Sequence, residues 1–226
     1  MTQKRWILAA AVLGSGIVFL DSTVVNVALP RIGRELPRLF LGVLEGQSYV
    51  YNAYLLTLSA LLILAGALSD FYGRKRMFLY GLVGFGLTSV LCGLAPNMEL
   101  LVLFRILQGA AGALLVPGSL ALLTANFSGE EQGRAFGVWA GASGATTILG
   151  PVIGGLLVDT ISWRAAFLIN IPLVARISTG WGRRWWRWPS AASPSAPSTA
   201  SSEPGATRSA TSRWRWVSSR PSRYRS

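Results

Sequence analysis

Two charged residues stand inside long apolar stretches of the sequence. Asp21 lies in the stretch that begins near Trp6, and Arg105 lies in the one that begins near Leu100. An ionised side chain at the centre of a bilayer costs about 3 kcal/mol on insertion scales, so such a residue is expected to face a polar cavity or an opposite charge. A carboxylate so placed could bind and release a proton, which makes Asp21 a candidate proton-binding group.

Each of these charges also has a structural explanation. Asp21 could be a structural carboxylate near the end of its helix, hydrogen-bonded to Thr23 or to a neighbouring helix. Arg105 lies close to the start of its apolar stretch, so its long side chain could extend to the polar interface of the membrane. A guanidinium cannot be neutralised by losing a proton, so Arg105 otherwise needs an acid, a cavity or backbone carbonyls. The residues alone leave these alternatives open.

Enzymatic chemistry has little support in the sequence. The chain contains no His, which excludes His-based metal sites and Ser/His/Asp triads. Its single Cys92 lies in an apolar segment and is expected to be a small buried residue. The sequence contains no phosphate-binding glycine loop with Lys and Ser or Thr, and no cluster of metal ligands. We predict no enzyme activity, no catalytic residue, no metal site and no cofactor.

Two further patterns could be functional or merely structural. In the segment 66–76 (GALSDFYGRKR), Gly73 permits a tight turn after which the cations at 74–76 can meet Asp70. An ordinary anchored turn would look the same. Gly150 and Gly154 have the small-xxx-small spacing that lets two helices approach closely, and the proline between them adds a bend. Packing alone would explain this second pattern.

The elements that must hold these residues are expected to be membrane-spanning helices. Hydrophobic residues make up 51% of the 226 residues and charged ones only 13%. The apolar stretches approach or exceed the roughly 20 residues that a helix needs to cross a bilayer. They cover residues 6–29, 49–69, 77–95, 100–127 and 135–158, with a partial sixth at 165–175 that meets Arg176. We predict an all-α membrane protein, with five full transmembrane helices and a partial sixth forming one bundle.

The placement of Lys and Arg predicts the orientation in the membrane. Short connections dense in positive charge resist translocation, and Arg74, Lys75 and Arg76 form such a cluster between two predicted spans. This places the N-terminus on the cytoplasmic side. We expect a multi-pass protein of the cell (inner) membrane, with the lipid bilayer as its first partner.

Composition changes abruptly at Arg176. Up to Ala175 there are 11 basic and 8 acidic residues, a net charge of +3, whereas the remainder holds 10 Arg and 1 Glu, a net charge of +9. The segment 176–226 is rich in Arg, Ser, Pro and Trp and shows no apolar period, so it is expected to be disordered. We interpret it as a tail derived from a reading-frame change. Binding of anionic lipid is a weaker alternative, and binding of nucleic acid is not expected.

Five motifs along the chain resemble the N-terminal part of a major facilitator superfamily transporter, over about residues 6–175. The turn 66–76 is similar to the family's signature between helices two and three, but Phe71 replaces a usual basic residue. The segments 101–109 and 150–155 resemble its fourth-helix and antiporter motifs, although Thr146 replaces a usual upstream Gly. The segments 20–30 and 163–172 resemble motifs of the fourteen-helix drug:proton antiporter branch.

The resemblance implies export of small amphipathic compounds in exchange for protons, with the proton gradient as the only energy source. It implies that Asp21 and Arg105 form a proton and charge relay. It implies a gating loop formed by Gly66, Asp70, Gly73, Arg74 and Arg76. It also implies a helix motif that limits leak, formed by Gly150, Pro151, Gly154 and Gly155. A truncated or frameshifted copy is expected. The alternative is a membrane interaction protein, either a half-transporter that pairs with a second chain or a subunit that docks through its basic tail.

Overall fold

The computed structural model describes the backbone of residues 3–185 and the side chains of residues 4–178. Every regular element in this part of the chain is a helix, as predicted. The helices are α1 (Gln3–Glu35), α2 (Val43–Tyr72), α3 (Arg74–Gly93), α4 (Met98–Asn126), α5 (Gly129–Thr160), α6 (Ala165–Leu168) and α7 (Asn170–Trp185). Residues 186–226, which hold most of the predicted tail, lie outside the described residues.

Helices α1 to α5 are long and apolar enough to cross a membrane, in agreement with the five predicted spans. Each begins earlier than its apolar stretch, because a helix can start within the polar residues that precede an apolar run, and in α4 and α5 these residues suit the first turn. The side chain of Asn97, for example, accepts a hydrogen bond from the backbone N–H of Leu100 at 2.9 Å and so caps α4. Glu130 and Glu131 occupy the first turn of α5, where the helix dipole favours acidic groups.

The last helical segment differs from the prediction in where it ends. It begins at Ala165 as expected and is interrupted at Ile169, but α7 then continues through Arg176 to Trp185. Arg is a good helix former, so a cation does not end a helix even where it ends an apolar run. The apolar part, Ala165–Ser178, is shorter than the five candidate spans.

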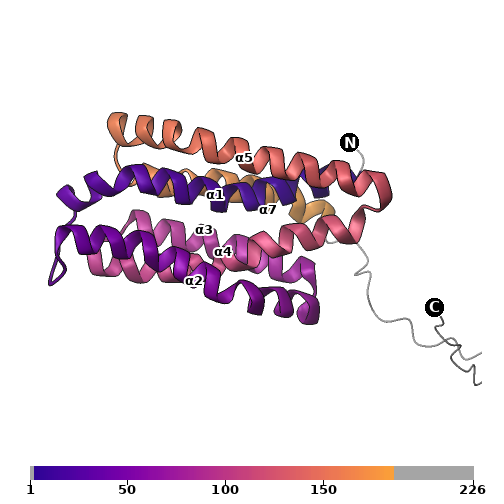
Figure 1. Cartoon of the computed structure of the whole chain (residues 1–226), viewed down its shortest axis with the longest axis horizontal. Coiled ribbons are helices and arrows are strands. Elements are labelled where there is room, and N and C mark those ends of the chain that lie inside the picture. Colours follow the sequence, from indigo (N-terminus) through magenta and orange to yellow (C-terminus); the bar gives the residue numbers. More distant parts are fainter. Residues whose placement is uncertain (1–2, 186–226) are drawn as a thin grey trace, which may run out of the picture. The chain divides into compact units, whose positions relative to one another are not determined.

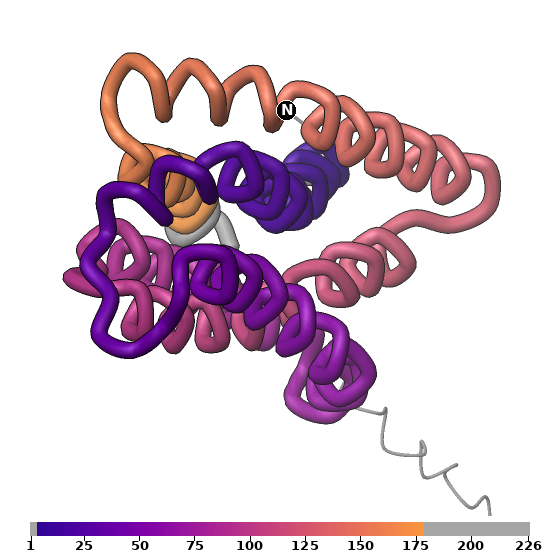
Figure 2. Tube along the Cα trace, turned by 60° about the vertical axis from the view of Figure 1, so that its left-hand side comes forward, coloured from indigo at the N-terminus to yellow at the C-terminus, as the bar shows by residue number. Residues whose placement is uncertain are grey.

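The long helices pack lengthwise in pairs (Figure 1). The most extensive contacts join α2 to α4, α3 to α4 and α1 to α5. In the turned view, α1 and α5 lie on one side and α2, α3 and α4 on the other, with α7 between the two groups (Figure 2). Helix α1 contacts α5 in its own group, α2 and α4 in the other group, and α7 between the two groups.

The interior combines apolar packing with buried polar groups, whereas the exterior is largely apolar. Large side chains such as Leu56 and Ile63 on α2 and Ile148 and Val152 on α5 are exposed. Water would not favour such a surface, but hydrocarbon solvates it. Several polar side chains are instead fully buried among the helices: Ser15, Asp21, Ser89, Arg105, Gln108, Ser119 and Asn170. This distribution fits a helical bundle with lipid outside and a polar interior.

A carboxylate fixes the end of the bundle at which α4 begins. Glu99 Oε1 accepts hydrogen bonds from the backbone N–H groups of Leu39, Phe40 and Leu41 at 2.9, 3.1 and 3.3 Å. The backbone N–H of Met98 donates to the carbonyl of Pro37 at 2.9 Å. These bonds fasten the connection between α1 and α2 to the first turn of α4, and so set the register of α4 against both helices.

Candidate functional site

The two charges that the sequence singles out form an ion pair in the interior of the bundle. Asp21, midway along α1, and Arg105, in the third turn of α4, are both 0% exposed. Arg105 Nη1 lies 2.5 Å from Asp21 Oδ2. The guanidinium does not extend to an interface, and the hydroxyl of Thr23 donates to carbonyls of its own helix rather than to Asp21.

Helix α2 completes the surroundings of the cation. Arg105 Nε donates to the backbone carbonyl of Val50 at 3.2 Å. Arg105 Cζ also lies 4.0 Å from the centre of the Tyr54 ring and 5.9 Å from that of Phe167, distances at which the face of an aromatic ring attracts a cation. The Tyr54 hydroxyl donates to the carbonyl of Val18 at 3.2 Å, which ties α2 to α1 beside the ion pair.

Two amides bind the other carboxylate oxygen. Gln108 Nε2 and Asn170 Nδ2 each donate to Asp21 Oδ1 at 3.0 Å. Both amides also donate to Ser89 Oγ, at 2.8 and 3.2 Å respectively. We call Asp21, Ser89, Arg105, Gln108 and Asn170 the buried polar cluster. It joins α1, α3, α4 and α7, and with Val50 it also includes the backbone of α2.

Hydrogen bonding is what makes this buried charge pair tolerable. Removing two charges from water costs several kcal/mol per ion, and their attraction offsets that only when the remaining polar atoms are also bonded. Asp21 accepts three hydrogen bonds, and Arg105 Nη1 also donates to Gln108 Oε1 at 2.8 Å. Two atoms of the cluster are nevertheless buried without a hydrogen-bond partner in the part of the chain that the structure describes, Arg105 Nη2 and Asn170 Oδ1. The cluster is therefore well compensated but not saturated.

Sequence reasoning identified only part of this cluster. It singled out Asp21 and Arg105 because charge is costly in an apolar stretch. Ser89, and Tyr54 beside the cluster, carried no such signal. Asn170 did carry one: it is the only Asn, Gln, Asp, Glu, Lys or Arg between Arg164 and Arg176. The buried thiol of Cys92 donates to Gln108 Oε1 at 3.4 Å and otherwise packs as the small apolar residue that was expected.

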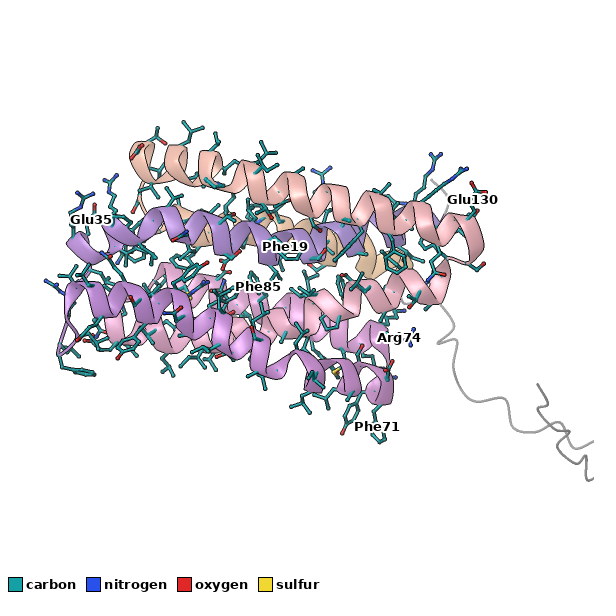
Figure 3. All side chains as sticks on the ribbon, viewed as in Figure 1. Phe19, Glu35, Phe71, Arg74, Phe85 and Glu130 are labelled. Atoms are coloured by element: carbon teal, nitrogen blue, oxygen red, sulfur yellow. The ribbon has the colours of Figure 1, made fainter. Side chains whose placement is uncertain are left out.

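The turn between α2 and α3 brings together part of the predicted gating loop. Arg74 Nε lies 3.1 Å from Asp70 Oδ1, and Arg74 Nη1 contacts the carbonyl of Ala121 and the hydroxyl of Thr124 on α4, at 3.3 and 3.4 Å. Gly73 has a φ of +97°, which L-residues with side chains rarely adopt. Figure 3 shows Arg74 and Phe71 at the opposite end of the bundle from Glu35.

The remaining residues predicted for that loop contribute less. Arg76 is exposed, and a side chain added at Gly66 would meet only open space. The structure thus pairs Asp70 with Arg74 beside the turn at Gly73, joins Arg74 to α4, and leaves the other two residues outside this contact.

Two glycines of α5 lie against α1 beside Asp21. A methyl group added at Gly150 would overlap Thr23 Oγ1, and one added at Gly154 would lie 3.0 Å from the Cα atom of Val24. The predicted close approach of two helices is thus confirmed, and its partner is the helix that carries the carboxylate. Pro151 lies within α5, and a side chain added at Gly155 would meet no neighbouring atom.

Comparison of the sequence with known proteins identifies relatives of this chain. The family profile described as Major Facilitator Superfamily matches residues 11–223. The tetracenomycin C resistance and export protein of Streptomyces glaucescens is 42% identical over 166 residues, which is 74% of this chain and 30% of that protein. The probable actinorhodin transporter of Streptomyces coelicolor is 40% identical over 182 residues, 78% of this chain and 31% of that protein.

A solved structure has the same fold. It is a bacterial homologue of the human lysosomal transporter Spinster in an inward-facing, unoccupied conformation. The TM-score is 0.60 at 17% identity, and the match covers 84% of this chain and 44% of that one. The chain thus spans less than a third of each of the two curated relatives and less than half of the solved structure.

Mutation of the ion pair should reveal coupling between its members. Asp21→Asn or Arg105→Leu alone leaves the opposite charge buried without its partner and should lower the free energy of unfolding by about 3–5 kcal/mol. The double variant removes both charges, so its loss should be clearly smaller than the sum of the two single losses. Denaturant titration in mixed micelles measures this, and strictly additive losses would contradict the pairing.

The contact between α1 and α5 predicts opposite outcomes for two neighbouring glycines. Gly150→Ala introduces an overlap with Thr23 and should lower the free energy of unfolding by about 1–3 kcal/mol. Gly155→Ala meets open space and should leave it unchanged or raise it by up to about 1 kcal/mol, because Ala is the better helix former. Equal effects in the same titration would show that α5 does not approach α1 at Gly150.

Proposed function

The chain belongs to the Major Facilitator Superfamily, and we propose that it provides the N-terminal part of a proton-coupled exporter of small drug-like compounds. The observation that carries this proposal is the ion pair between Asp21 and Arg105, buried in the interior of an apolar helical bundle. An ionisable residue inside a membrane is functional by default, because lipid makes it expensive to keep there.

The geometry supports a specific role for each charge. While Asp21 is ionised, it holds Arg105 and thereby links α1 to α4. When Asp21 binds a proton, the Coulomb attraction disappears and Arg105 keeps its charge, since a guanidinium does not deprotonate. The cation is then no longer balanced by a full negative charge, so it can attract a substrate dipole or repel a second proton. Proton binding thus changes the forces between two helices of the bundle.

Two other sites would serve the same transport cycle. The ion pair of Asp70 with Arg74, together with the bond of Arg74 to α4, would hold one conformation and release in another. The glycines of α5 would fix α1 and close the pathway against leak. Rocking of two helical domains about a central site would then expose it alternately to the two sides of the membrane.

The substrate class follows from the relatives. Their names specify export of tetracenomycin C and transport of actinorhodin, and we extend the class of small drug-like compounds to this chain. We place the chain in the cell (inner) membrane with its N-terminus in the cytoplasm, as the cation cluster at 74–76 favours.

A second candidate function is pairing with another membrane chain, without transport by this chain alone. The exposed apolar faces of α2 and α5 favour it. On α5, a Cβ atom added at Gly141, Gly144 or Gly155 would have no described atom within 4 Å, so another helix could approach this face closely. A second half-transporter chain is the partner of matching chemistry.

The transport proposal predicts exchange that depends on Asp21. In vesicles that contain the full chain together with any partner purified with it, an imposed proton gradient should drive uptake of a fluorescent amphipathic cation. Asp21→Asn should reduce the gradient-driven rate at least about tenfold, because its side chain cannot bind and release the proton. Leu87→Ala on the exposed face of α3 is the matched control and should behave as wild type. Equal rates for Asp21→Asn and wild type would refute proton coupling through Asp21.

The pairing proposal predicts a covalent product. Cysteine introduced at Gly144, in a Cys92→Ser background, should form a disulfide with a second copy or a co-purified chain when an oxidant is added in the membrane. Cysteine introduced at Leu87 should form less. If neither position yields a product above the monomer, pairing through α5 is excluded.

A further inference from the structure

The two amides that bind Asp21 differ in how firmly their orientation is fixed. Gln108 Oε1 accepts hydrogen bonds from Arg105 Nη1 and from the thiol of Cys92, at 2.8 and 3.4 Å. Turning this amide would place its NH₂ group against the guanidinium, donor against donor. The carbonyl oxygen of Asn170, in contrast, is buried and has no hydrogen-bond partner among the described residues. Turning the Asn170 amide therefore breaks no bond to that oxygen.

Protonation of Asp21 would create a conflict that only one of these amides can resolve. In the ionised state Arg105 donates to Oδ2, and both amides donate to Oδ1. A proton added at Oδ1 makes that atom an O–H donor, which then faces two N–H donors. Gln108 cannot turn to accept this proton without losing its bond to Arg105. Asn170 can, because its amide would exchange an N–H donor for a carbonyl acceptor.

The hydroxyl of Ser89 fits the turned state as well. In both of its hydrogen bonds within the described part of the chain, Ser89 Oγ acts as the acceptor, from Gln108 Nε2 and from Asn170 Nδ2. Its own O–H can therefore rotate toward Asn170. After the amide turns, Asn170 Oδ1 could accept from Asp21 and from Ser89 at the positions that its nitrogen now occupies, 3.0 and 3.2 Å away.

We propose that Asn170 is a positioning residue that reads the protonation state of Asp21 by turning its side-chain amide. It presents N–H to the carboxylate and C=O to the carboxylic acid. This inference rests on the proposed function in taking Asp21 as the group that binds the proton. One proton from the aqueous phase is added to Asp21, and no bond at Asn170 is formed or broken other than hydrogen bonds.

The location of Asn170 would pass this change on to the last helical segment. Asn170 is the first residue of α7, directly after the interruption at Ile169. Pro172 has no backbone N–H, so the carbonyl of Leu168 lacks its usual partner four residues later. Helices α6 and α7 both contact α1 and α3. A change of bonding at Asn170 thus acts where the helix is least constrained by its own hydrogen bonds.

Spectroscopy of the Asn170 amide tests the inference directly. The full chain is prepared in lipid nanodiscs with asparagine labelled at the side-chain nitrogen, which gives five candidate signals. The signal absent from both Asn170→Leu and Asn170→Ser belongs to Asn170. Acidification should move this signal in the wild-type chain and leave the signals of Asn26 and Asn126 in place.

The Asp21→Asn variant provides the matched control. Arg105 should hold the carbonyl of the new side chain, so that its NH₂ group faces Asn170 as the O–H of a protonated Asp21 would. The Asn170 signal of this variant should already lie at the acidic wild-type position and should not move with pH. If this variant does not fold, the wild-type titration still decides. A wild-type signal that acid does not move, or one that moves equally in Asp21→Asn, would overturn the inference.

Failure of the inference is distinguishable from failure of the proposed function. Gradient-driven exchange that needs Asp21, together with a static Asn170 signal, would refute the amide switch and retain the exporter. An Asn170 signal in Asp21→Asn that matches acidified wild type, without any coupled exchange, would support the switch and refute the exporter.

Discussion

An ion pair shielded from water determines how the helices of this chain must assemble. Neither the carboxylate of Asp21 nor the guanidinium of Arg105 could be buried in an apolar interior unless other groups replaced the water around them. Four helices contribute side chains to the buried polar cluster, and a fifth contributes the carbonyl of Val50 and the ring of Tyr54. The helices are thus joined by hydrogen bonds as well as by apolar packing. Apolar packing alone is a weak source of specificity between helices surrounded by lipid.

Contacts outside the pair keep its two helices in register. Glu99 fastens the connection between α1 and α2 to the start of α4, fewer than two helical turns before Arg105. On the other side of α1, Gly150 and Gly154 let α5 approach the two residues that follow Ser22. The position of Asp21 thus depends both on the end of α1 and on the contact of α1 with α5.

The sequence predicts the elements of this fold better than it predicts their contacts. Apolar length is a local property, and it located all five long helices. It misplaced the end of the last one, because Arg176 ends an apolar run without ending a helix. Burial cost also identified Asp21 and Arg105 individually. Their pairing, and the part played by Ser89 and Tyr54, depends on the register between helices. The apolar patterns of those helices do not determine that register.

Proton-coupled export, as we propose it, requires that Asp21 takes up a proton inside the bundle. Difference infrared spectroscopy of the full chain in lipid tests it most directly, because a protonated carboxyl group has a C=O band that a carboxylate lacks. The account predicts that acidification produces such a band in the wild-type chain and that this band is missing from the spectrum of Asp21→Asn. Identical acid-induced spectra for the two proteins would contradict it.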